Sequence, residues 1–308
     1  MREIRIGSRG SRLALVQTNA IAAALKAEDP DLSVEVEIVH TQGDLVTDRP
    51  LAQIGGSGLF IKEIEQALLD GRIDLAVHSL KDLPSVMAEG FALAAVTERL
   101  DPRDALVSRR APRIEELPEG ARLATGSLRR RSQLLALRPD LEIEDLRGNV
   151  PTRLDKFDAS NWEAIVLASA GLERLGLAER ITAPIPVASM LPAVGQGALA
   201  LETRTEDTEL RERLAFFDHQ ATATAIRSER AFLARLQGGC QVPIAAHAVT
   251  GPETLLLEGY VGSVDGRRHV RQKIEGAKAS ASELGLALAE SMLAAGADSI
   301  VRELGGAP

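Results

Sequence analysis

Short apolar runs alternate with amphipathic stretches over the first hundred residues of the chain. Residues 3–8 predict a strand, and the apolar positions at 13–25 recur at the spacing of one helix face. Strict alternation at 34–38 predicts a second strand, a helix ends near Gly71, and the apolar run 73–79 predicts a third strand. This succession of strand, helix, strand, helix and strand is typical of a parallel sheet.

The pattern restarts after a charged, proline-containing stretch at 98–104, which predicts a domain boundary. Strands and helices alternate again from 104 to about 190, as in a second α/β unit. Three prolines and two glycines at 181–202 predict that the chain crosses back to the first domain, so that two crossovers form a hinge. A helical run at 221–237, two further strands and an amphipathic helix from about 280 predict a small α+β domain.

Composition narrows the class of protein. One cysteine, Cys240, excludes an internal disulfide and a multi-cysteine metal site, and the five histidines lack metal-ligand spacing, so we expect no metal. The N-terminus lacks the apolar core of a signal peptide and no stretch approaches the ~20 apolar residues of a membrane helix, so we expect a cytoplasmic protein without membrane contact. A net charge of −8 argues against nucleic acid.

The basic residues are concentrated in one segment of this acidic chain. Residues 122–153 hold seven arginines against four acids. Thr125 and Ser127 lie at a predicted strand-to-helix turn, where backbone N–H groups and the helix dipole favour an anion, and Arg129 and Arg130 follow in the first helical turn. The arrangement predicts a carboxylate or phosphate site; the alternative is a solvated helix face.

Two further places could carry chemistry. The predicted strand 73–79 ends in the polar residues Ser79, Lys81 and Asp82, at the edge where open α/β sheets bind ligands, although such a pair is often only a surface pair. Cys240 follows two glycines and precedes a predicted strand, so its sulfur is expected on a loop. A lone cysteine is more often an inert buried residue than a reactive one, so the interpretation as a reactive thiol needs support from other residues.

Two glycine-rich segments, GGSGLF at 55–60 and AVGQGAL at 193–199, have neither the spacing of a P-loop nor that of a dinucleotide-binding loop. We expect both to be turns or hinges that need positive φ.

Seven ordered motifs resemble the porphobilinogen deaminase family, also called hydroxymethylbilane synthases, nearly from end to end. They are RIGSRGSRLALVQ (5–17), GGSGLFIKEIE (55–65), HSLKDLPS (78–85), ATGSLRRRSQL (124–134), LRGNVPTRL (146–154), LPAVGQGAL (191–199) and GGCQVPIAAHA (238–248). The resemblance implies two α/β lobes like those of periplasmic binding proteins, a central cleft and a small α+β third domain. The implied limits are 1–98 with 198–217, 103–192, and 220–308.

The resemblance also implies an activity and a cofactor. The family joins four porphobilinogen molecules head to tail, with loss of ammonia, on a covalent dipyrromethane primer, and then releases linear hydroxymethylbilane by hydrolysis. Cys240 would carry the primer as a thioether, which suits a nucleophilic sulfur. Asp82 would protonate the departing amine and stabilise the cationic intermediate. The family suggests a monomer.

Every pyrrole ring carries an acetate and a propionate, and the planar fork of arginine suits these carboxylates. The resemblance implies cofactor contacts at Ser79, Lys81, Thr125, Ser127, Arg129, Arg130 and Arg147. It implies substrate contacts at Arg9, Ser11, Gln17, Arg153, Arg174 and Gln196.

The sequence departs from the family at two places and leaves two alternatives open. Ser57 stands where lysine is frequent, which removes one cation, and Ala245 stands where glycine is usual. A ligand-binding protein without catalysis would use the same cleft but would not need Cys240. A Schiff-base enzyme would use Lys81 and could be trapped by borohydride.

Overall fold

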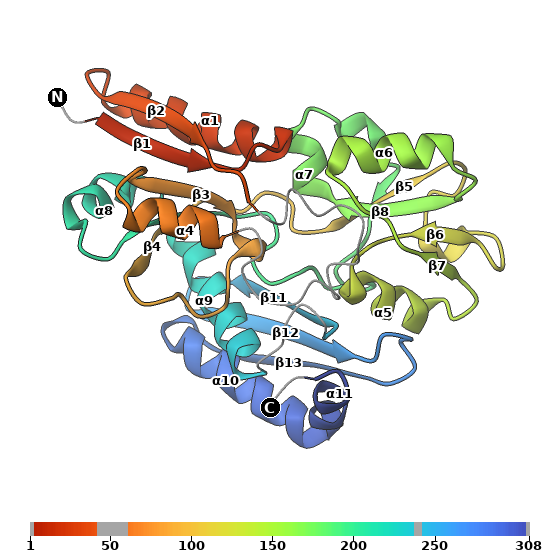
Figure 1. Ribbon diagram of the computed structural model, residues 1–308. Coiled ribbons are helices and arrows are strands. Elements are labelled where there is room, and N and C mark those ends of the chain that lie inside the picture. Colours follow the sequence, from red (N-terminus) through yellow and green to blue (C-terminus); the bar gives the residue numbers. More distant parts are fainter. Residues whose placement is uncertain (1–2, 42–60, 237–241, 306–308) are drawn as a thin grey trace.

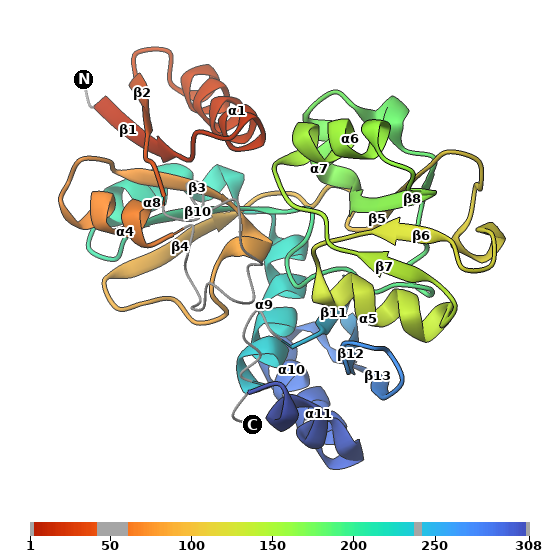
Figure 2. The same cartoon turned by 45° about the vertical axis from the view of Figure 1, so that its right-hand side comes forward.

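The computed structural model describes residues 3–41, 61–236 and 242–305. Three β-sheets organise these residues, and the first two lie side by side with the third beneath them (Figures 1 and 2). The first two are mixed sheets flanked by helices, and the third is an antiparallel meander packed on helices. The predicted fold class, two α/β lobes and a small α+β unit, is therefore confirmed.

The first lobe is built on a five-stranded sheet. Its strands, in sheet order, are β2 (Ser33–Ile38), β1 (Glu3–Ser8), β3 (Leu75–Ser79), β10 (Leu199–Arg204) and β4 (Phe91–Val96). The expected parallel order holds for β1, β2 and β3, but β10 lies antiparallel between β3 and β4. The place of β10 was not predicted, because periodicity gives the position of a strand and not the direction of a partner that returns from far along the chain.

Helices cover the faces of this sheet. They are α1 (Arg12–Glu28), α4 (Lys62–Leu69) and α8 (Thr208–Leu214). Ile4 and Ile6 of β1 alternate with outward residues and pack with Ile21 of α1 and Leu75 of β3, which is the pattern expected of a half-buried strand against an amphipathic helix.

The second lobe repeats the arrangement. In sheet order its strands are β7 (Glu142–Glu144), β6 (Arg122–Ala124), β8 (Ala164–Ala168), β5 (Asp104–Ser108) and β9 (Ala183–Pro184), and its helices are α5 (Leu128–Leu137), α6 (Val150–Ala159) and α7 (Ser169–Arg174). β6 and β8 are parallel, whereas β5 is antiparallel to β8. The start of β5 therefore lies at the same edge as the carboxyl ends of β6 and β8.

The third unit joins three strands to three helices. These are α9 (Gln220–Arg235), β11 (Ile244–Thr250), β12 (Thr254–Gly262), β13 (His269–Ala277), α10 (Ala281–Met292) and α11 (Asp298–Glu303). Phe232 of α9 and Met292 of α10 are buried in one core with Leu257 of β12. A side chain at Gly259 would meet the ring of Phe232, so glycine lets α9 pack directly on the strand.

Residues Lys278–Glu303 form a helical run that is long and apolar enough, by length and composition, to cross a membrane. In the structure, Leu288, Ala289 and Met292 of this run lie in the core of the third unit. We therefore interpret it as a core helix of that unit.

The two segments that connect the lobes are held to the third unit by one buried ion pair. Arg99, in the first segment, donates from both terminal nitrogens to Glu229 of α9 at 2.7 Å, and its Nε donates to the carbonyl of Gln196 in the second segment at 2.9 Å. Glu229 also accepts the N–H groups of Gly195 and of Ala248 in β11, at 2.8 and 2.9 Å. One carboxylate thus joins both connecting segments to the third unit.

The glycines of the second connecting segment have the backbone predicted for them. Gly195 and Gly197 have φ of +74° and +97°, and a Cβ at Gly197 would lie 2.6 Å from the carbonyl oxygen of Leu100. Both positions therefore need glycine. The other predicted glycine turn, at 55–60, lies outside the described residues.

Candidate active site

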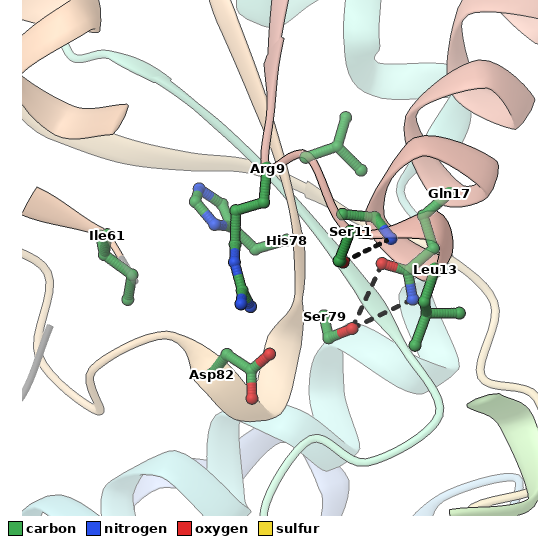
Figure 3. Close-up of a pocket in the computed structure, with 10 residues that line it drawn as sticks. Arg9, Ser11, Leu13, Gln17, Ile61, His78, Ser79 and Asp82 are labelled. Atoms are coloured by element: carbon green, nitrogen blue, oxygen red, sulfur yellow. Dashed lines mark hydrogen bonds between the residues drawn. The ribbon is translucent and has the colours of Figure 1, made fainter. Parts of the chain in front are cut away.

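The carboxyl end of β3 forms one wall of the candidate site. Ser79 ends the strand, and a 3₁₀ turn over Leu80–Asp82 follows it. Ser79 exchanges hydrogen bonds with Gln17 of α1, at 3.0 and 3.3 Å, which fixes both side chains beside a pocket (Figure 3). Arg9, Ser11, Gln17, His78, Ser79 and Asp82 are among the residues that line this pocket. Four predicted substrate or cofactor contacts and the predicted catalytic residue are thus brought together.

Asp82 presents an available carboxylate to this pocket. The residue is exposed, and its carboxylate makes no hydrogen bond or salt bridge with another described residue. The guanidinium of Arg9 points toward it (Figure 3). The charge of Asp82 also acts on Lys81 and on Arg153 of α6, in the second lobe. A carboxylate so placed can accept, hold or donate a proton and can stabilise a cation.

Lys81 lies beside Asp82 and reaches toward the second lobe. Its Nζ is 3.5 Å from Oε1 of Gln196, which is buried. The residue keeps surface open to solvent, but the surrounding protein desolvates the ammonium and lowers the pKa of Lys81 to about 8. Asp82 opposes this shift of the pKa and Arg130 adds to it. Lys81 is therefore a cation that can lose its proton in mildly alkaline solution.

The predicted strand-to-helix turn in the second lobe is the start of α5. Ser127 is the N-cap and accepts the N–H of Arg130 at 3.4 Å, while the hydroxyl of buried Thr125 accepts the N–H of Ser127 at 3.3 Å. A Cβ on Gly126 would lie 2.6 Å from the carbonyl oxygen of Leu146, so glycine is required there. The hydroxyls of Thr125 and Ser127 therefore stabilise the turn. They also lie near the backbone N–H groups at the start of α5.

Arg129 and Arg130 are engaged by a residue that the sequence analysis did not identify. Asp104, at the start of β5, accepts from Arg129 at 2.7 and 3.2 Å and from Arg130 at 2.7 and 3.0 Å. Gln196 donates to the same carboxylate at 3.0 Å. The arginines also donate to the carbonyl oxygens of Leu191 and Val166. The two guanidinium groups are therefore held in place before any ligand arrives.

Electrostatics explains why this buried triad is stable. Burial by itself would raise the pKa of Asp104, but the charges and hydrogen bonds of Arg129 and Arg130 outweigh it and hold the pKa of that carboxyl well below its usual range. Burial lowers the pKa of Arg130, and Asp104 opposes that. One carboxylate against two guanidinium groups leaves the triad with a net positive charge.

Asp104 could have been noticed from its place before the apolar run at 105–107, since a strand that starts with a buried acid needs a partner. The position of Asp104 at the ligand-binding edge of the sheet could not have been predicted, because it depends on β5 being antiparallel to β8.

Three more arginines surround the same region. Nη1 of Arg147 is buried and has no hydrogen-bond partner among the described residues. Burial lowers the pKa of Arg153 to about 10, with Arg130 and Arg147 adding to the shift, and its Nε donates to the carbonyl of Gly148. Burial likewise lowers the pKa of Arg174 to about 10, and Arg174 donates to the carbonyl of Gly197. Cations thus accumulate here without enough acids to neutralise them, as in a site for anions.

Other predicted features fall outside this cluster. Cys240 and Ser57 lie outside the described residues, and Ala245 is buried in β11. His78, which lines the pocket, was not predicted as a site residue; its Nε2 lies 2.9 Å from the buried carboxylate of Glu202 in β10.

Comparison with known proteins gives nearly complete coverage by one family. Residues 4–212 match the family model described as porphobilinogen deaminase, dipyromethane cofactor binding domain, and residues 223–294 match porphobilinogen deaminase, C-terminal domain. The chain is 50% identical over 303 residues to the porphobilinogen deaminase of Geobacter metallireducens, covering 98% of this chain and 95% of that protein. It is 50% identical over 301 residues to that of Syntrophus aciditrophicus, with 98% of each chain covered.

Similarity to solved structures is lower. A lipoprotein of the YaeC family from Enterococcus faecalis superimposes with a TM-score of 0.42 at 14% identity, over 72% of this chain and 94% of that one.

Proposed function

This chain belongs to the porphobilinogen deaminase family, and on that premise we propose how its own residues carry the reaction. The enzyme is a transferase that condenses four porphobilinogen molecules head to tail, with loss of ammonia, into linear hydroxymethylbilane on a dipyrromethane cofactor. The observation that carries the assignment is the match of both family models in order over nearly the whole chain.

Asp82 is the proposed catalytic residue. When the carbon–nitrogen bond of the substrate breaks, the electron pair leaves with nitrogen as ammonia, and positive charge develops on the methylene-pyrrole. A carboxylate that has no salt bridge with a described residue can stabilise this charge and hold the proton of the departing amine. Arg9 lines the same pocket and is placed to bind a carboxylate of the substrate.

The residues of this region fit the dipyrromethane cofactor. That group has four carboxylates, and the buried Nη1 of Arg147 is a donor that finds no partner among the described residues, as expected where a ligand supplies the acceptor. Cofactor carboxylates would be held by Arg147, Lys81, and the α5 turn with Thr125 and Ser127. The cofactor, when bound, supplies the pyrrole carbon on which the chain grows. Cys240 is the proposed attachment point.

The paired arginines Arg129 and Arg130 were predicted to contact the cofactor. In the structure both are also bonded to Asp104. We propose that they still face cofactor carboxylates with their remaining N–H groups, and that Asp104 positions them. Arg153, Arg174, Ser11, Gln17 and Gln196 are the proposed substrate contacts.

We also propose the domain limits 1–98 with 198–217, 103–192, and 220–308. We further propose that the protein is a cytoplasmic monomer without membrane contact. The net charge of −8 supports the proposal that it does not bind nucleic acid.

Mass spectrometry of the intact protein tests the cofactor assignment. Freshly purified enzyme should exceed the mass of the chain by two porphobilinogen units less two ammonias, and peptide mapping should place the excess on Cys240. Cys240→Ser should lack the adduct and be inactive, because an alkoxide forms far less readily than a thiolate. An active enzyme with unmodified Cys240 would refute the covalent attachment of the cofactor. The two alternatives, a ligand-binding protein and a Schiff-base enzyme, would then explain the site.

A further inference from the structure

A second cavity lies at the junction of the first lobe and the third unit. Its volume is about 470 Å³, and it opens between β4 and α9. Leu93 and Val96 of β4 form one wall, and Ile226, Arg227 and Arg230 of α9 form the opposite wall. None of the described residues that line it also lines the pocket at Asp82. The volume is within the range of small-molecule sites, which are frequent at domain junctions.

Two cations line this cavity without an ion-pair partner among the described residues. Arg227 and Arg230 are three residues apart, so they lie on one face of α9. Neither guanidinium makes a hydrogen bond or a salt bridge with any residue that the structure describes. Arg230 is half-buried, and burial lowers its pKa, while the charge of Glu202 opposes the shift. A half-buried cation without a partner is unfavourable, so the site has unused capacity for an anion.

The acid in the lining, Asp218, makes no ion pair with either of these arginines. Asp218 accepts the N–H of Val96 with one oxygen, at 2.9 Å, and the side-chain amide of Gln220 with the other, at 2.7 Å. The remaining polar lining residues are the serines Ser85 and Ser282. The cavity therefore combines one carboxylate, two hydroxyls, an apolar surface and two guanidinium groups that have no ion-pair partner among the described residues.

We propose that this cavity is a second binding site, separate from the active site, for a small organic anion that carries carboxylates on an apolar ring. Guanidinium forks match carboxylates, and the apolar wall favours a ring over an inorganic ion. Such a ligand would bridge β4 and α9 and so tie the third unit to the first lobe. This role is distinct from the condensation reaction.

The test uses the cofactor-loaded enzyme and benzene-1,2-dicarboxylate as the probe, with isothermal titration and a crystal soaked with the probe. Density for the probe should lie between β4 and α9. The double variant Arg227→Gln with Arg230→Gln should bind the probe at this site at least about tenfold more weakly. Each replacement removes a charge-assisted hydrogen bond to a carboxylate of the probe, and such bonds contribute a substantial part of the binding free energy of a small ligand. Its porphobilinogen turnover should stay within about twofold of wild type, since neither side chain lines the Asp82 pocket.

Arg235→Gln is the matched control. Arg235 lies on the same helix but pairs with Glu290, outside the cavity, so its replacement should leave probe binding unchanged. If the double variant does not fold, exposed Arg227→Gln alone serves, with an expected loss of about threefold. Equal binding by wild type and variant, density only at the Asp82 pocket, or inorganic phosphate binding as tightly as the probe would overturn the proposal.

Discussion

Replacing Asp104 by Asn should destabilise the protein strongly, although the two side chains are nearly equal in size. The carboxylate receives five hydrogen bonds, four from Arg129 and Arg130 and one from Gln196, and its side chain is fully buried. Asn keeps the shape but removes the charge and turns one acceptor into a donor that faces a guanidinium. Two buried cations are then uncompensated, a change that costs about 3–5 kcal/mol of unfolding free energy.

Urea unfolding at neutral pH measures this loss, and Asp101→Asn is the control. Asp101 pairs with Arg103, whose side chain is 42% exposed, so its loss should cost no more than about 1 kcal/mol. The dependence on pH adds a second check. Because the folded pKa of Asp104 is depressed, its stabilisation is complete above the unfolded pKa of about 3.9 and is lost as the pH falls through the folded value.

The difference between wild type and Asp104→Asn should therefore be constant from about pH 5 to pH 8 and shrink only in stronger acid. If Asp104→Asn unfolds within about 1 kcal/mol of wild type, the account of the triad as the support of the two arginines is wrong.

Three further changes probe the site. Asp82→Asn should fold normally and lose about two or more orders of magnitude in turnover, and retention of more than about a tenth would remove its catalytic role. Arg147→Gln should leave the unfolding free energy of the cofactor-free protein undiminished but lower the cofactor-loaded fraction, seen by intact mass, at least about tenfold, because its Nη1 has no partner among the described residues. Since burial lowers the pKa of Lys81 to about 8, turnover of porphobilinogen should fall as the pH passes that value, because a cofactor carboxylate then loses its cation. Lys81→Arg should move the fall to higher pH, and an unchanged profile would contradict the assignment of Lys81 to the cofactor.

Local patterns predicted the elements and the site edge well. Alternation at 34–38 and the helical spacing at 13–25 correspond to β2 and α1, because each element buries one face of its own sequence. Of the polar residues predicted at the end of the run 73–79, Ser79 and Asp82 do line a pocket, because a buried strand must end in groups that tolerate water. The family resemblance was confirmed over nearly the whole chain.

Long-range partners could not be predicted in this way. Nothing in the sequence around Arg129 says that its counter-ion lies 25 residues earlier, at the start of an antiparallel strand. The insertion of β10 between β3 and β4 likewise depends on pairing across more than a hundred residues. The roles of Cys240, Arg9 and the other predicted contacts stay predictions.

The ion pair between Arg99 and Glu229 limits how the molecule can change shape. Both connecting segments are bonded to it, one through Arg99 and the other through Gly195 and Gln196. A rotation of one lobe relative to the other must therefore turn about this point, since moving the point itself would expose a buried carboxylate. Groups near the pivot, such as Lys81 with Gln196, would keep their spacing, while groups farther from it would move more.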